Sequence, residues 1–133
     1  MLKIKNTDRD QLHLYTASLM LKIASADDIV EESEINVILD ILCDFYKISI
    51  YRAKELIVEA KKINDDSTDL YEVGSFINNS LSLKDKLDFI SCIYGVAYAD
   101  NNMHFIERHI IKQIVNILNI NKDELKKIKK DLL

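Results

Sequence analysis

No proline interrupts this chain of 133 residues, and its two glycines are Gly74 and Gly95. Proline ends helices and glycine supplies the left-handed backbone of tight hairpin turns, so a chain with so little of either favours long helices over short strands. Its apolar residues recur every three or four positions, as at Tyr15, Leu19 and Ile23, which is the period of an amphipathic helix. The sequence therefore predicts an all-α fold.

This periodicity predicts about seven helices in one domain that spans residues 1–133. Their approximate ranges are 11–26, 32–45, 49–63, 69–78, 83–99 and 105–118, followed by a lysine-rich C-terminal helix. Ser49, Ser82 and Asn121 precede three of these segments and suit the N-cap position, because their side-chain oxygens accept hydrogen bonds from the free amides of the first turn. Gly95 falls inside a helix, where we expect it to mark a close crossing with another helix.

Two segments of the chain match each other. Superposing residues 14–45 on residues 87–118 places apolar residues against apolar residues throughout, and both segments contain the pattern A-x-A-D-x6-E. We interpret the match as an internal duplication. It predicts two pseudo-symmetric helical hairpins that share one core.

Each copy of the pattern places acidic side chains at the turn between two helices. The aspartate stands at the turn, and the glutamate falls in the first turn of the following helix, where its charge meets the positive end of the helix dipole. Oxygen ligands of this kind suit a hard divalent cation such as calcium, magnesium or manganese. The spacing is too short for the loop of an EF-hand, so a cation site needs both turns together. The candidate ligands are Asp27, Asp28, Glu31, Glu34, Asp100 and Glu107.

A narrower hypothesis concerns the second turn alone. Asp100, His104 and Glu107 stand three or four positions apart, so they share one helix face and could form a zinc-like cluster. The first copy has Glu31 where His104 stands, so this cluster is not duplicated. His13 has no partner at ligand spacing.

The two turns resemble the signature of the TerB-like family, which comprises tellurite-resistance-associated domains and the related N-terminal part of some membrane-bound co-chaperones. That signature is Ala-Asp-Gly, an aliphatic residue and then Glu. Asp28 and Asn101 replace the usual glycine, and both residue types tolerate left-handed backbone. The resemblance implies an all-α binding module in which acidic side chains from both turns gather as a divalent-cation site, in a stress or tellurite-resistance context. The matching residues are Asp27, Val30 and Glu34, and then Asp100, Met103 and Glu107.

The acidic turns also have a purely structural interpretation. Glu34 and Glu107 occupy the capping-box position, from which a carboxylate accepts a hydrogen bond from the N-cap amide. The aspartates can accept hydrogen bonds from the amides of their own turns. The expected N-cap residues, Glu31 and His104, are poor caps, so half of each capping box is present. The acidic turns are therefore either a cation site or a pair of helix caps.

No pattern in the chain indicates catalysis. It lacks a nucleophile beside a base, a glycine-rich phosphate loop and the H-E-x-x-H motif, so we expect no enzymatic activity. The net charge of −4 comes without a basic cluster of the kind that binds nucleic acid. The alternative to cation binding is a structural adaptor for a protein partner or a membrane surface. Aromatic residues that suit either a ligand groove or the core and its rim are Tyr46, Tyr51, Tyr94 and Tyr98.

The C-terminal helix combines lysines with Leu125 and Ile128, so it suits an anionic membrane or an acidic partner, although such helices commonly just dock their apolar side on the core. Cys43 and Cys92 stand alone, without CxxC spacing, and are expected to be reduced and buried. No apolar run is long enough to span a membrane, and we expect a cytoplasmic protein. The lysines of the helix are Lys122, Lys126, Lys127, Lys129 and Lys130.

Overall fold

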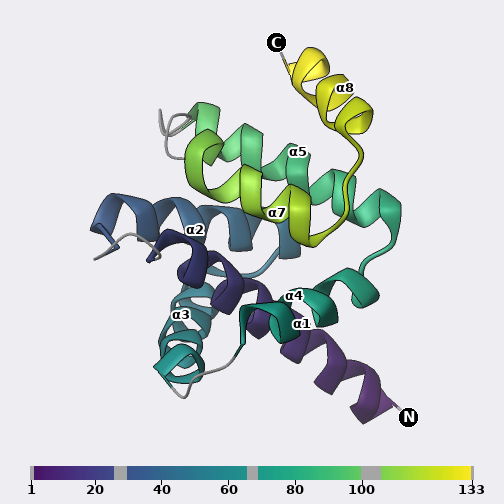
Figure 1. Cartoon of the computed structure of the whole chain (residues 1–133). Helices are drawn as coiled ribbons and strands as arrows, with labels where there is room; N and C mark the ends of the chain where they lie inside the picture. The colour runs from purple at the N-terminus through teal and green to yellow at the C-terminus, as the bar shows by residue number, and fades with distance from the viewer. Residues whose placement is uncertain (1, 26–29, 66–68, 100–105, 133) are drawn as a thin grey trace.

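The computed structural model describes residues 2–25, 30–65, 69–99 and 106–132, except for the side chains of 2–8, 107–109 and 132. Every regular element in these ranges is a helix, which confirms the all-α prediction (Figure 1). In chain order the described elements are α1 Leu2–Ala24, α2 Glu32–Tyr46, α3 Ile50–Asp65, α4 Leu70–Ser80, α5 Leu83–Ala99, the π-helix η1 Ile106–Ile111, α7 Lys112–Ile117 and α8 Lys122–Leu132.

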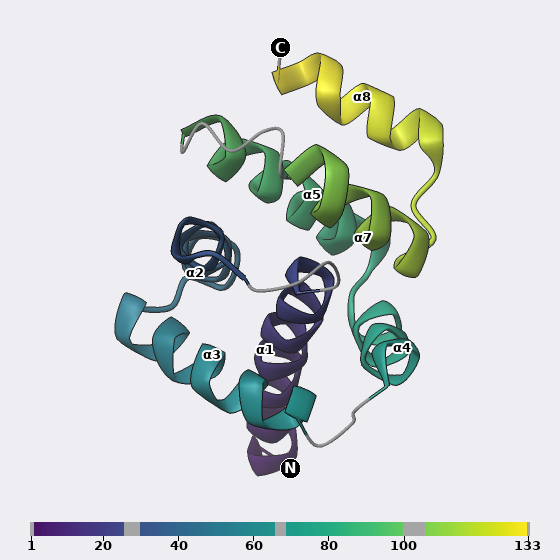
Figure 2. The same ribbon diagram turned by 60° about the vertical axis from the view of Figure 1, so that its left-hand side comes forward.

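α1 is the central helix of the fold. It contacts α2, α3, α4 and η1, with α2 and α3 on one side, α4 on the other, and α5 and α7 across its C-terminal end (Figure 2). Leu19, Ile38, Ile93 and Ile110 come from four different elements, and each is 0 % exposed within one hydrophobic cluster. Burying an aliphatic side chain of this size stabilises the fold by about 1.5–3 kcal/mol. Helices from both halves of the chain therefore contribute to one core.

The second hairpin differs from the prediction in its returning helix. The sequence predicts one continuous α-helix over 105–118, whereas the described part of that segment begins with the π-helix η1 and continues as α7. In a π-helix, hydrogen bonds join residues five apart, which brings such residues onto one face. Ile106, Ile110 and Ile111 are all buried, so the wider turn places two adjacent isoleucines in the core. The approximate two-fold symmetry of the hairpins stays a prediction.

α1 begins at Leu2, whereas the apolar period predicts a start near Gln11. No proline or glycine precedes Gln11, so nothing in the sequence prevents the helix from extending to Leu2. The helix ends at Ala24, just before the first acidic turn.

The predicted helix caps are confirmed. Ser49 Oγ and Ser82 Oγ each accept a hydrogen bond at 3.1 Å from the amide three residues further on. Asn121 Oδ1 accepts one at 2.7 Å from the amide of Asp123. Each cap satisfies an amide that has no partner within its helix and contributes about 1 kcal/mol.

The close helix crossing lies at Gly74, and the prediction that placed it at Gly95 is wrong. A Cβ added at Gly74 would lie 2.5 Å from Cγ2 of Ile117, where α4 contacts α7. A Cβ added at Gly95 would have nothing within 4 Å, because this exposed face of α5 has no close neighbour.

α8 packs against α5 with its apolar side. Leu125 and Ile128 are partly buried against the core, and Lys129 Nζ lies 5.8 Å from the centroid of the Tyr94 ring. No helix within the described ranges is long and apolar enough to cross a membrane. The exposed lysines of α8 are Lys122, Lys126, Lys127 and Lys130.

Candidate functional site

The predicted cation ligands fall only partly within the described part of the chain, which includes Glu31 and Glu34. The convergence of the two acidic turns therefore stays a prediction. Among the described residues, no three His, Cys, Asp or Glu side chains gather where they could hold a metal ion. Outside the described residues lie Asp27, Asp28, Asp100, His104 and the side chain of Glu107, whose backbone belongs to η1.

Glu34 acts as a helix cap in the first copy of the motif. Glu31 is the N-cap residue of α2, and its amide donates a hydrogen bond to Oε1 of Glu34 at 2.9 Å. The amide of Glu34 donates in turn to the main-chain carbonyl of Glu31 at 3.0 Å. These contacts confirm the capping-box position predicted for Glu34. The roles of Asp27 and Asp28, which lie outside the described residues, stay predictions. Oε2 of Glu34 takes no part in them.

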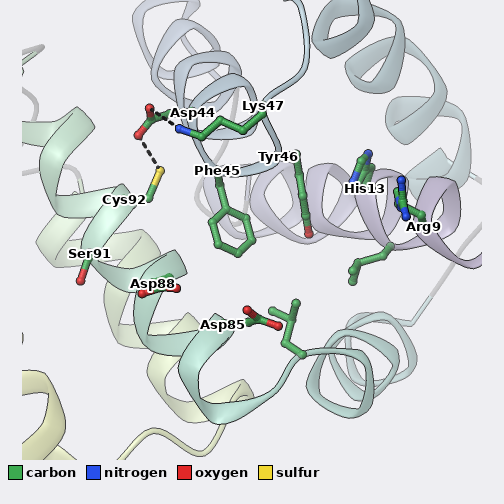
Figure 3. A pocket seen from close by; sticks show the side chains of 12 residues that line it. Arg9, His13, Asp44, Phe45, Tyr46, Lys47, Asp85, Asp88, Ser91 and Cys92 are labelled. Atoms are coloured by element: carbon green, nitrogen blue, oxygen red, sulfur yellow. Dashed lines mark hydrogen bonds and ion pairs between the residues drawn. The ribbon is translucent and has the colours of Figure 1, made fainter.

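A groove opens between α1, the C-terminal end of α2 and the first half of α5 (Figure 3). Its volume of about 780 Å³ lies within the usual range of ligand pockets. Aromatic rings, carboxylates and basic groups line it together. The side chains on which its chemistry depends are Arg9, His13, Asp44, Tyr46, Asp85 and Asp88.

The rings of His13 and Tyr46 lie against each other on the α1 side of the groove, with centroids 3.9 Å apart and planes tilted by 33°. Tyr46 Oη lies 2.6 Å from Oγ1 of Thr16, which donates a hydrogen bond to the Leu12 carbonyl at 2.7 Å. Because threonine has a single hydroxyl proton, Tyr46 is the donor to Thr16. His13 is 9 % exposed, and its imidazole has no hydrogen-bond partner among the residues that the structure describes.

Burial governs the protonation of both rings. It lowers the pKa of His13, while the carboxylate of Asp10 opposes this shift and Arg52 and Arg9 add to it. Burial also raises the pKa of Tyr46 far above its ordinary value. At neutral pH the groove therefore presents a neutral imidazole, which has one N–H donor and one acceptor nitrogen.

Three carboxylates line the groove: Asp44 at the C-terminal end of α2, and Asp85 and Asp88 on α5 (Figure 3). Asp44 Oδ1 lies 3.8 Å from Nζ of Lys47, and Asp44 Oδ2 accepts a hydrogen bond from Cys92 Sγ at 3.1 Å. Asp85 and Asp88 extend from α5 into solvent, and neither forms an ion pair with any described residue. The α5 side of the groove therefore carries two negative charges that no described cation pairs with.

The thiol of Cys92 lies in the groove but is not activated as a nucleophile. Burial raises the pKa of Cys92 to about 12, and the hydrogen bond to Asp44 acts in the same direction. Burial, followed by the charge of Asp40, also raises the pKa of Cys43. Both cysteines are free, as predicted, but they are half-buried rather than buried. Neither supplies a thiolate at neutral pH.

The sequence predicts Tyr46 as a residue of a groove or of the core rim, and it assigns no role to His13. A signal was available, since His13 and Thr16 are polar residues three positions apart on a helix whose neighbouring face is apolar. Two such residues facing the same way indicate a polar contact at the edge of the core. No local pattern places Asp85 and Asp88 across from them, because that juxtaposition depends on how α5 packs against the first hairpin.

A comparison with protein families finds a match over most of the chain. The matching family model is described as "Tellurite resistance protein TerB" and covers residues 13–130, which include both acidic turns and nearly all of the groove. No curated protein and no solved structure matches the chain.

Proposed function

Because the chain belongs to the TerB family, we propose that it acts as a non-enzymatic binding module whose groove between α1, α2 and α5 holds a segment of a protein partner. The observation that carries this proposal is the buried imidazole of His13, which lines an open groove and has no hydrogen-bond partner among the described residues. The nitrogens of His13 are not among the completely buried atoms that lack a partner, so solvent still reaches them. A ligand that hydrogen-bonds to the imidazole in place of this solvent gains affinity there.

Selection of binding peptides tests this function. Short random peptides displayed on phage are selected against the immobilised full chain, and the survivors are re-tested against Ser91→Trp, whose large side chain fills the groove from α5. Peptides that lose binding to Ser91→Trp but keep it to Ser33→Trp, an exposed position on α2, support the proposal. The proposal fails if every selected peptide binds wild type and Ser91→Trp equally.

A second candidate function is the binding of a divalent cation through the acidic turns. The duplication of the motif favours it, since two matched turns at one core offer the oxygen ligands that calcium, magnesium or manganese requires. Glu34 fits such a site as a monodentate ligand, because its Oε1 accepts the Glu31 amide and its Oε2 is left to reach a cation. The remaining proposed ligands are Asp27, Asp28, Glu31, Asp100 and Glu107, with His104 added if the ion is zinc.

Cation binding is tested by thermal unfolding. Millimolar calcium, magnesium, manganese or zinc is expected to raise the Tm, because a ligand that binds the native state stabilises it. The double variant Asp27→Asn/Asp100→Asn should lose that rise, whereas Asp65→Asn/Asp131→Asn, which removes the same charge elsewhere, should keep it. An equal rise in both variants would count against the acidic turns.

Membrane binding has less support than protein binding. Leu125 and Ile128 pack against the core, so the apolar side of α8 is already occupied and its lysines are left as a purely electrostatic surface. We propose a cytoplasmic protein that works in a stress response such as tellurite resistance, which is the context named by the family description.

A further inference from the structure

We infer that the groove binds a basic segment of a partner protein, in which a lysine or arginine lies along the aromatic rings and reaches the carboxylates of α5. This inference rests on the proposed function of the groove and adds the chemistry of the occupant. It draws on three features of the groove, which are its carboxylates without an ion pair, its row of rings and an imidazole that makes no hydrogen bond within the described ranges.

The carboxylates define the sign of the charge that fits. Asp85 and Asp88 are three residues apart on α5, so their side chains lie on the same face of the helix. Neither forms an ion pair within the described ranges, and both line the groove. Asp44 is already engaged by Lys47 and Cys92. The side chain that complements the α5 wall is therefore a cation.

The rings define the shape of that cation. Phe45 and Tyr46 have centroids 4.8 Å apart, and the tilted ring of His13 lies 3.9 Å from that of Tyr46, so three rings form a continuous row between α1 and α5 (Figure 3). The methylene stem of a lysine or arginine packs against such a row while its charged end stays near solvent and carboxylate. A bare metal ion gains nothing from the rings.

The imidazole points to a peptide rather than a free amine. Neutral His13 offers one donor and one acceptor on the buried side of the groove, and a main chain carries both complementary groups. The volume of about 780 Å³ accommodates several neighbouring side chains besides the cation. On the α1 side, Arg9 repels a second basic residue, so the cationic end of the segment is directed toward α5.

The composition of the selected peptides tests this inference. Peptides that depend on the groove, as judged by loss of binding to Ser91→Trp, are expected to be enriched in lysine or arginine beside apolar residues. Their affinity should fall about fivefold in Asp85→Asn/Asp88→Asn and should fall further as salt rises from about 50 to about 300 mM. The control Glu72→Gln/Asp131→Asn changes the net charge equally at exposed positions and should bind as wild type does.

The variant His13→Phe tests the contribution of the imidazole to binding independently of the contribution of the carboxylates. This variant keeps a ring against Tyr46 but removes the hydrogen-bonding nitrogens, so we expect a loss of affinity of about fivefold with unchanged salt dependence. Circular dichroism of each variant verifies that the fold is intact.

The possible outcomes distinguish the inference from the function on which it rests. Groove-dependent peptides without lysine or arginine would overturn the basic segment and leave the binding function standing. The absence of any groove-dependent peptide would overturn both. Dimerisation of the wild type that Asp85→Asn/Asp88→Asn abolishes would assign the cation to α8 of a second copy and contradict a separate partner.

Discussion

Individual residues in the groove are held in their neutral forms by burial. The pKa of His13 is lowered, while those of Tyr46 and Cys92 are raised. All three shifts oppose charge on the buried side of a groove whose rim carries unpaired carboxylates. The groove thus combines a neutral floor with a negative wall, an arrangement suited to recognition rather than to proton transfer.

The lowered pKa of His13 makes stability depend on pH. The unfolded chain binds a proton at this residue near pH 6.5, whereas the folded chain does so only at lower pH, so stability falls as the pH drops through 6.5. His13→Phe should therefore lose less stability than wild type between pH 7.5 and pH 5. Urea unfolding of both proteins at the two pH values measures this difference. Parallel losses in both proteins would show that the carboxylates alone cause the acid sensitivity.

The raised pKa of Cys92 predicts a slow thiol. In a Cys43→Ala background, Cys92 should react with iodoacetamide at pH 8 far more slowly in the folded chain than in urea, because its pKa of about 12 leaves little thiolate. Asp44→Asn removes the second cause of the raised pKa of Cys92 and should increase its labelling rate. Burial, the main cause, should keep that rate below the rate in the unfolded chain. Rapid labelling of the folded Cys43→Ala protein would contradict this environment.

The two glycines have opposite roles in their helices, and substitution by alanine distinguishes them. Gly74→Ala should destabilise the fold by about 1–3 kcal/mol, because the new Cβ overlaps a branched atom of Ile117 that cannot rotate away freely. Gly95→Ala should stabilise it by about 0.5–1 kcal/mol, because alanine restricts the unfolded chain and meets no neighbour. Urea unfolding measures both, and a stabilising Gly74→Ala would contradict the close contact between α4 and α7.

Local signals in the sequence predict the helices well and their contacts poorly. Ser49, Ser82 and Asn121 cap their helices as predicted, because a cap depends on residues within one turn. The π-helical turn at Ile106 and the crossing at Gly74 depend on neighbours far along the chain. The same distinction applies to the candidate sites. A short motif could indicate Glu34, whereas the groove exists only once α5 lies beside α1 and α2.

Both hairpins contribute to one core in the whole molecule, so we expect the chain to unfold as a single domain. Ile93 of α5 is completely buried in the same cluster as Leu19 of α1 and Ile38 of α2, and the hairpins touch where α2 meets α5 and α1 meets η1. Truncating a buried isoleucine costs about 2–5 kcal/mol. In a single cooperative unit, this loss of stability lowers the exchange protection of every slowly exchanging amide, including those of the other hairpin.

Hydrogen exchange of Ile93→Ala tests this coupling. The slowest amides of α2 and α3 should lose as much protection as those of α5, although neither α2 nor α3 carries the substitution. Val58→Ala is the matched control, because Val58 is 55 % exposed and its truncation should leave protection nearly unchanged throughout. Loss of protection confined to α5, η1 and α7, with α1 to α3 unaffected, would mean that the two hairpins unfold independently and that the chain contains two units rather than one.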